Sequence, residues 1–188
     1  MKYSLLILVT LPLFLLTAGC SHAPDLPVYN TVPHFSLTDS YNRPFNSDTV
    51  RGKVWVADFI YTHCPGPCPR MTSQMHRISN EVAGKTDVYL VSFTVDPARD
   101  TPVVLNDFAQ KFGGPSAQWS FLTGSPDTLH LLARKVFAVG DLVGVMDHST
   151  KFILVDKTSR IRGYYSTFDP EGMRTLLHNI DSLRKEAA

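Results

Sequence analysis

Residues 54–70 read VWVADFIYTHCPGPCPR, and this stretch determines the fold we expect. Its first eight residues are mostly apolar and rich in β-branched and aromatic side chains, which predicts a strand buried on both faces. Three prolines at alternate positions then restrain the chain around Cys64 and Cys68, and Gly66 permits a tight turn between them. Pro69 suits the first position of a helix, which would make Cys68 the N-cap residue. The sequence therefore predicts two cysteines at a junction between a strand and the N-terminus of a helix.

The elements predicted on either side of this junction alternate between strands and helices. We expect strands near residues 35–38, 88–95 and 119–123, helices at 71–82, 103–112, 126–136 and from 170 onward, and a hairpin of 152–156 with 161–165. This order predicts an α/β domain with right-handed crossovers and an antiparallel edge. The closest architecture is a thioredoxin-like fold, in which helices flank a central mixed sheet, with an inserted helix and strand and additional N-terminal strands.

The composition excludes several classes of protein. The chain has 188 residues, of which 44% are hydrophobic and 19% are charged, which is typical of one globular domain rather than a disordered chain. Its 18 basic and 17 acidic residues give a formal charge of +1. A nucleic-acid-binding protein would need a concentrated excess of positive charge for phosphates, so we expect no nucleic-acid partner.

The N-terminal residues resemble an export signal. Lys2 is followed by an almost wholly apolar stretch at residues 5–16, which is too short to span a bilayer comfortably. Residues 16–20 read LTAGC, a pattern similar to the lipobox at which bacterial lipoproteins are cleaved and the cysteine is lipidated. An ordinary signal peptide that happens to contain Cys20 is the alternative. We therefore predict a signal peptide at 1–19, a lipidated tether at 20–33 and a domain at 34–188.

This organisation predicts a lipid-anchored protein of the bacterial cell envelope whose domain faces the periplasm. Without residues 1–19 the chain carries equal numbers of acidic and basic residues, so lipid rather than charge would hold it at a membrane. The sequence leaves open whether that membrane is the inner or the outer one. An exported domain faces an oxidising compartment, where Cys64 and Cys68 can form a disulfide unless they are kept reduced.

The C-x-x-x-C spacing of Cys64 and Cys68 directs two thiols at a common point. Partial positive charge at a helix N-terminus favours the thiolate, which is the form that binds metal or attacks disulfides. Two soft sulfur ligands select Cu(I), with zinc possible, and a third donor is expected from elsewhere in the fold. A structural disulfide that closes a short loop is the alternative, although it would add little stability.

Several separated motifs resemble the Sco/SenC family of copper-binding, thioredoxin-like proteins. Residues 62–69 match the family pattern T-H-C-P-x-x-C-P after a strand, and VSFTVDP at 91–97 precedes Asp100-Thr101-Pro102. A DHST stretch at 147–150 follows before the predicted hairpin, and the resemblance extends from residue 32 to the C-terminus. One departure is Gly66, where family members commonly carry an acidic residue; its absence could alter redox poise or partner contact but not the ligand set.

The resemblance implies that His148, which lies 80 residues after Cys68, is the third copper ligand. Its position in a loop-like stretch before a predicted strand is compatible with that role. His63 adjoins Cys64, but successive side chains of a strand point to opposite faces, so we expect it to face away. Asp96 is the candidate for a carboxylate near the metal, and capping a turn is its alternative role.

The remaining candidate ligands fit ordinary surface or core positions. Methionines at helical spacing are usually core residues, and histidines within predicted helices are usually on the surface or packed. This set comprises His22, His34, His76, His130, His178, Met71 and Met75.

The resemblance implies a copper chaperone that carries Cu(I), Cu(II) or both. Its client would be the dinuclear copper centre of cytochrome c oxidase subunit II, or another periplasmic copper or thiol protein. The alternative is a thiol-disulfide oxidoreductase in which Cys64 and Cys68 exchange disulfides with a client and copper is incidental. Peroxide reduction would need threonine and arginine partners for the cysteine, and we find no such set.

Overall fold

Strands β4 (Val54–Ile60) and β5 (Val88–Thr94) form the centre of the sheet, and every residue of both is buried. They pair in parallel with each other, as β5 does with β6 (Trp119–Thr123). The computed structural model describes residues 26–139 and 150–186, in which the strand order is β1-β8-β7-β4-β5-β6-β2-β3. These features confirm the predicted mixed α/β sheet.

The outer strands pair in antiparallel fashion on both sides of this centre. They are β1 (Asn30–Thr31), β2 (Ser36–Asp39), β3 (Pro44–Asn46), β7 (Lys151–Val155) and β8 (Arg160–Ser166). The predicted hairpin is present as β7 and β8.

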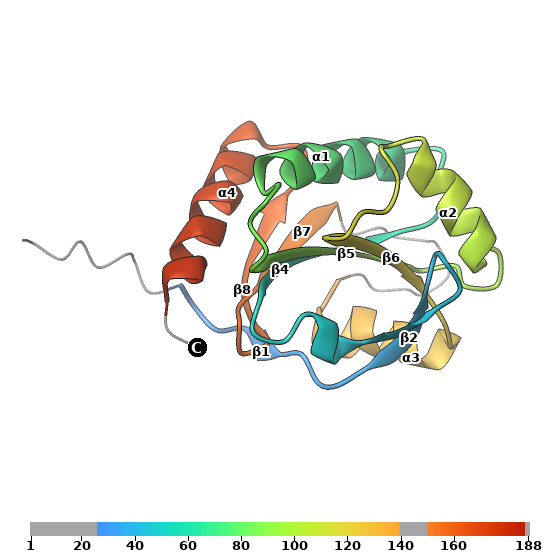
Figure 1. The fold of residues 1–188 in the computed structure, drawn as a ribbon, viewed down its shortest axis with the longest axis horizontal. Helices are drawn as coiled ribbons and strands as arrows, with labels where there is room; N and C mark the ends of the chain where they lie inside the picture. The colour runs from blue at the N-terminus through green and yellow to red at the C-terminus, as the bar shows by residue number, and fades with distance from the viewer. Residues whose placement is uncertain (1–25, 140–149, 187–188) are drawn as a thin grey trace, which may run out of the picture.

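Helices cover both faces of the sheet (Figure 1). Helices α1 (Pro67–Glu81), α2 (Pro102–Gln110) and α4 (Pro170–Lys185) pack on one face and complete one apolar core. On the other face α3 (Pro126–Leu131) continues into a π-helical turn, η2 (Leu132–Val136), and a short 3₁₀ helix, η1 (Ser47–Thr49), follows β3. Among the described helices, none has the length and apolar character needed to cross a bilayer.

The chain joins the domain earlier than we predicted. Residues 20–33 were expected to be a tether, but Asn30 pairs with Ile161 in the sheet and Val32 is buried in the core. The side chain of Asn30 also donates hydrogen bonds to the carbonyls of Lys135 and Val136. A two-residue edge strand has no hydrophobic periodicity, so the sequence pattern could not show it.

The two ends of β4 face different parts of the molecule. At its start, the backbone N–H of Gly52 donates to the carbonyl of Lys157, in the turn of the β7–β8 hairpin. Near this turn the buried guanidinium of Arg162 binds the carbonyl of Leu26 and pairs with Glu186, which follows α4. At its other end, β4 leads into the loop of Cys64 and Cys68. Seven residues of strand, or about 23 Å, therefore separate the point where the described chain begins from the cysteines.

Candidate metal and thiol site

The loop between β4 and α1 brings Cys64 and Cys68 together. Helix α1 begins at Pro67, with Gly66 as its N-cap residue, so Cys68 lies in the first turn and is not the N-cap residue that we predicted. The first turn of a helix has no acceptors for its N–H groups, so prolines at both 67 and 69 are tolerated there. The Cys64 sulfur accepts a hydrogen bond from the backbone N–H of Cys68 at 3.4 Å. It thus serves as the acceptor that the glycine cap cannot supply.

Both thiols are free and nearly inaccessible to solvent. Cys64 is 7% exposed and Cys68 is fully buried, where they join the core beneath α1. Cys64 is therefore the sulfur that an incoming partner or ion reaches first. Cys68 lies behind it.

The pKa values of the two thiols are shifted in opposite directions. Burial opposes ionisation of Cys64, yet hydrogen bonds from the Cys68 thiol, from the N–H groups of Cys68 and Gly66 and from Tyr61 together hold its pKa below the usual value. Burial raises the pKa of Cys68, and the neighbouring Cys64 and Asp58 raise it further. The Cys64 thiol therefore ionises before the Cys68 thiol, and the first negative charge of the pair is located on Cys64.

Tyr61 is the aromatic residue next to this charge. It is buried, and burial together with its hydrogen bond to Cys64 raises the pKa of the phenol to about 12. The phenol therefore remains protonated and donates to the Cys64 sulfur. This hydrogen bond stabilises the thiolate relative to the thiol.

A buried carboxylate fixes the start of the cysteine loop. Asp100 accepts hydrogen bonds from the hydroxyl of Thr62 at 2.6 Å and from its backbone N–H at 3.1 Å. It also accepts one from the hydroxyl of Thr94, at the end of β5, at 2.5 Å. Asp100 is fully buried, so these bonds satisfy a charge that would otherwise be costly. They tie the loop two residues before Cys64 to the neighbouring strand.

Two residues singled out from the sequence lie at the margin of the site. Asp96 pairs with the exposed guanidinium of Arg99 at 3.2 Å, so its role near a metal stays a prediction. The ring of His63 is 62% exposed, and its Nδ1 lies 3.0 Å from the hydroxyl of Thr62. The expectation that His63 points outward from the loop agrees with this placement.

Asp58 is a second buried carboxylate under the cysteines. It lies on the same sheet face as Val56 and Ile60, which pack in the core with Cys68, and it is fully buried. Neither oxygen has a hydrogen bond of ordinary geometry with the described residues. Burial raises the pKa of Asp58 to about 7, and the adjacent Ser92 offsets this only in part.

Two predicted site residues, His148 and Cys20, lie outside the described residues. Of the other candidates, Met71 and Met75 are buried in the core and the ring of His76 packs against Gly113, as expected for structural residues. Among residues 26–139 and 150–186, no group of three or more histidine, cysteine and acidic side chains could hold a metal ion. The described part of the site therefore provides two sulfur donors.

The two sulfurs fit a soft metal ion and also fit disulfide chemistry. Thiolates are preferred ligands of Cu(I), and the fold holds Cys64 on the loop and Cys68 in the first turn of α1, both at a helix N-terminus. The same site has one outer thiol with a lowered pKa and a fully buried second thiol behind it, which is the arrangement of a nucleophilic and a resolving cysteine.

Sequence reasoning missed the roles of Tyr61, Asp100 and Asp58. For Asp58 the signal was an acidic residue inside an otherwise apolar strand. For Asp100 it was an acid directly before a Thr-Pro helix start, but its contact with Thr62 spans 38 residues and required the fold. For Tyr61 the sequence carried no signal besides its place at the end of the strand.

Comparisons with known proteins identify relatives of the whole domain. The family model described as SCO1/SenC matches residues 24–183. The SCO1 protein homolog of Bacillus subtilis is 35% identical over 127 residues, which is 66% of this chain and 65% of that protein, just under two thirds of its length. A protein of Stutzerimonas stutzeri whose name describes it as copper-binding is 29% identical over 166 residues, covering 82% of this chain and 79% of that protein.

Solved structures show the same fold. A SCO1/SenC family lipoprotein from Bacillus anthracis has a TM-score of 0.74 and 30% identity, covering 83% of this chain and 96% of that one. BsSco, described as a member of the Sco family of cytochrome c oxidase assembly proteins with a disulfide switch, has a TM-score of 0.74 and 27% identity, covering 86% and 98%. The predicted thioredoxin-like architecture is thereby confirmed.

Proposed function

Because this chain belongs to the SCO1/SenC family, we propose that it binds copper through Cys64 and Cys68 and serves in the assembly of a cytochrome c oxidase. The observation that carries this proposal is the pair of free, buried thiols on one loop, with the pKa of Cys64 held below its usual value. Two thiolates form a good site for a soft ion such as Cu(I). A relative named for copper binding and a solved family member described as an oxidase assembly protein support the same function.

Copper binding by the reduced and the oxidised chain tests the proposal. The reduced full-length chain, purified in detergent, should retain about one copper per chain after gel filtration, and the Cys64–Cys68 disulfide form should retain little, because thiolates are the ligands. Cys64→Ala and Cys68→Ala should each remove tight binding. Met71→Leu is the matched control, since it removes a buried sulfur next to the loop and keeps the volume. Full retention by the oxidised chain would contradict the assignment of the two thiols.

His148 is proposed as the third ligand. The support is the family resemblance of residues 147–150, together with the lack of a third donor beside the thiols among the described residues. A neutral imidazole adds a nitrogen donor, which also suits Cu(II). Copper binding should then weaken below the pH at which this imidazole protonates.

The proposed client is the dinuclear copper centre of cytochrome c oxidase subunit II. Copper would pass from the two thiolates to the client, or the thiols would prepare the client's cysteines to receive it. Copper transfer from the loaded chain to a purified soluble domain of subunit II tests this step. If copper stays on this chain in the presence of the reduced domain, another client must be sought.

Lipid anchoring in the bacterial envelope is proposed from the lipobox-like residues 16–20. A Cys20→Ala chain should remain unprocessed and lack the lipid, whereas Cys64→Ala should partition as the wild type does. Metabolic labelling with a radioactive fatty acid reads this directly. Equal labelling of the Cys20→Ala chain would contradict the proposal.

Thiol-disulfide exchange is the second candidate function, favoured by the opposite acidities of the two thiols. The Cys64 thiolate would attack a client disulfide and release one client thiolate, which takes up a proton. Cys68 would then displace the second client thiol, so that the client gains two electrons and Cys64–Cys68 becomes a disulfide. His148→Ala separates the two functions, because it should weaken copper binding and leave exchange with a model disulfide intact.

A further inference from the structure

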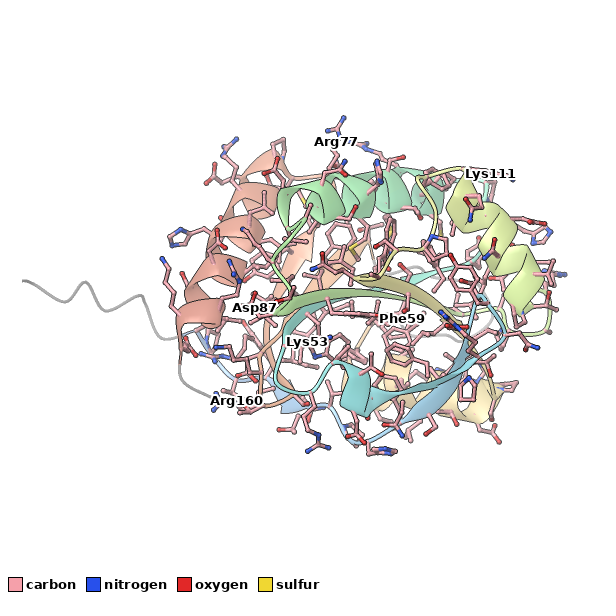
Figure 2. The ribbon with its side chains drawn as sticks, viewed as in Figure 1. Lys53, Phe59, Arg77, Asp87, Lys111 and Arg160 are labelled. Atoms are coloured by element: carbon pink, nitrogen blue, oxygen red, sulfur yellow. The ribbon has the colours of Figure 1, made fainter. Side chains whose placement is uncertain are left out.

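A groove lies between α1 and the turn that leads into α4. Arg70, Gln74 and Arg77 line it from α1, Phe168 and Met173 line it from the other side, and it encloses about 230 Å³. Residues four and seven positions apart lie on one face of a helix, so the three α1 side chains form a row. Figure 2 shows Arg77 projecting from α1 away from the sheet.

The two arginines of this row have no acidic partner. The guanidinium of Arg70 stacks on the ring of Phe168, with 4.4 Å between its central carbon and the ring centroid. Arg70 and Arg77 are both exposed, and neither makes a hydrogen bond or ion pair with any residue of 26–139 or 150–186. None of the residues that line the groove is acidic. Of the two acids beside the groove, Asp169 accepts the backbone N–H of Glu171, and Glu171 pairs with Arg174.

The arrangement of these side chains suits a ligand that presents several carboxylates along an extended segment. A stacked guanidinium is held in one orientation and keeps its N–H edge free, and that edge binds a carboxylate through two parallel hydrogen bonds. Seven helical residues place the two arginines about 10 Å apart along α1. Side chains of Phe168 and Met173 supply apolar contact between the charges. The groove therefore has the chemistry to hold a peptide segment that carries more than one acidic side chain.

The position of the groove favours a protein partner over a membrane surface. Arg70 lies two residues after Cys68, and Phe168 lies just before the start of α4. The described chain begins at the other end of α4, where Arg162 binds the carbonyl of Leu26 and pairs with Glu186. The 16 residues of α4 span about 24 Å, so the groove faces the same end of the domain as the cysteines.

We propose that the groove between α1 and α4 docks an acidic segment of the partner protein that approaches Cys64 and Cys68. The docking surface rests on the proposed function for the identity of its partner, whereas carboxylate recognition by Arg70 and Arg77 involves neither thiol and can be measured separately. Its effect would be to hold a client beside the thiols while the exchange of metal or of a disulfide proceeds.

Fluorescence anisotropy of a labelled peptide of alternating glutamate and alanine tests the proposal on the full-length chain in detergent. The wild type should bind the peptide at low salt and lose affinity as salt is raised. Arg77→Gln should weaken binding about tenfold, as expected for a lost charge-assisted hydrogen bond, and Arg70→Gln should do the same. Arg77→Lys should restore part of the affinity because it keeps the charge. Arg51→Gln is the matched control, since this arginine is exposed, paired with Asp48 and located after η1 on the other face of the sheet, and it should change binding less than twofold.

Near-UV circular dichroism of the same variants detects a folding defect, and their copper retention detects damage to the proposed copper site. Both defects can thus be distinguished from a loss of peptide binding by the groove. If Arg70→Gln disturbs the fold, Arg77→Gln decides the outcome alone. The proposal is overturned if the wild type does not bind the glutamate peptide, or if both glutamine variants bind it as the wild type does. It is also overturned if millimolar inorganic phosphate displaces the peptide completely, or if phosphatidylglycerol vesicles bind through these arginines and the peptide does not.

Discussion

Tyr61 provides a phenol donor at the sulfur whose charge the site depends on. Burial and the hydrogen bond to Cys64 raise the pKa of this phenol to about 12, so it stays protonated while Cys64 titrates. The pKa of Cys64 is lowered although burial opposes it, which shows that donors around the sulfur outweigh desolvation. The lowered pKa of Cys64 therefore results from hydrogen bonds to its sulfur and not from exposure to solvent.

Replacing Tyr61 with phenylalanine should raise the pKa of Cys64, because a donor to the thiolate is lost while the buried ring remains. The pH dependence of Cys64 alkylation by iodoacetamide, measured in a Cys20→Ala background, reports this pKa. The midpoint should move to higher pH than in the parent chain. An unchanged midpoint would show that the Cys68 thiol and the backbone donors hold the thiolate without the phenol.

His148 and His63 are expected to differ in their contribution to copper binding. His148→Ala should weaken Cu(II) far more than Cu(I), because two thiolates suffice for Cu(I) whereas Cu(II) prefers nitrogen donors. His63→Ala is the control and should change both affinities little, since its ring is exposed and lies beside the Thr62 hydroxyl. Spectroscopic titration of both oxidation states across the two variants measures this. A larger effect at His63 would mean that the other histidine is the ligand.

Among the elements, the loop from β4 to α1 is held by a contact between distant segments. Asp100, just before α2, accepts hydrogen bonds from Thr62 in the loop and from Thr94 in β5. Three elements therefore meet at one buried carboxylate. The proposed copper ligands would therefore depend for their position on a residue that touches neither sulfur.

Asp100→Ala should lower the free energy of unfolding by about 1–3 kcal/mol, since it leaves buried donors unpaired. It should also weaken copper binding about tenfold, because the loop before Cys64 loses its attachment. Asp107→Asn, on the exposed face of α2, is the control and should change neither quantity. Urea unfolding and copper competition with a chelator give the two numbers. Unchanged copper affinity in Asp100→Ala would contradict the positioning role.

The elements also show what the sequence could and could not predict. Strands β4, β5 and β6 were predicted nearly to the residue, because runs of buried β-branched, aromatic and other apolar side chains, complete in β4 and β5, leave little alternative. The start of α1 was misplaced because prolines at 67 and 69 are both compatible with a first turn. Strand β1 and the roles of Asp100 and Asp58 depend on contacts between distant segments, and no local pattern encodes them. The spacing of Cys64 and Cys68 was enough to identify them as a site. The opposite directions of their pKa shifts depend on burial and on hydrogen bonds, which only the folded structure shows.

At the scale of the whole molecule, the sheet separates the cysteine loop from the place where the chain enters. The buried Arg162 pairs with the buried Asp156 and the partly exposed Glu186, and its bond to the carbonyl of Leu26 fixes that residue at one end of the sheet. The thiols and the arginine groove lie at the other end. A chain anchored through its N-terminus would therefore present its thiols away from the anchoring surface.

Stability should depend on pH through Asp58. Its pKa is raised from 3.8 to about 7 by burial, so the folded state holds a proton that the unfolded state has lost between these pH values. Stability from this group is thus fully present below about pH 4 and is lost as the pH rises toward 7, by roughly 4 kcal/mol in total. Other carboxylates, such as Asp156 and Asp87, have lowered pKa values and act in the opposite sense.

The difference between the wild type and Asp58→Asn isolates this contribution. Urea unfolding at several pH values should show that the variant gains stability relative to the wild type as the pH rises from 4 to 7. A constant difference across this range would mean that Asp58 is ionised in the folded protein.

The most direct test of the copper site is X-ray absorption at the copper edge of the loaded, reduced full-length chain. We expect two sulfur ligands and a nitrogen ligand around copper, with one sulfur lost in Cys68→Ala and the nitrogen lost in His148→Ala. A copper environment without sulfur in the wild type, or one that is unchanged in Cys68→Ala, would contradict the assignment of Cys64 and Cys68 as the copper site.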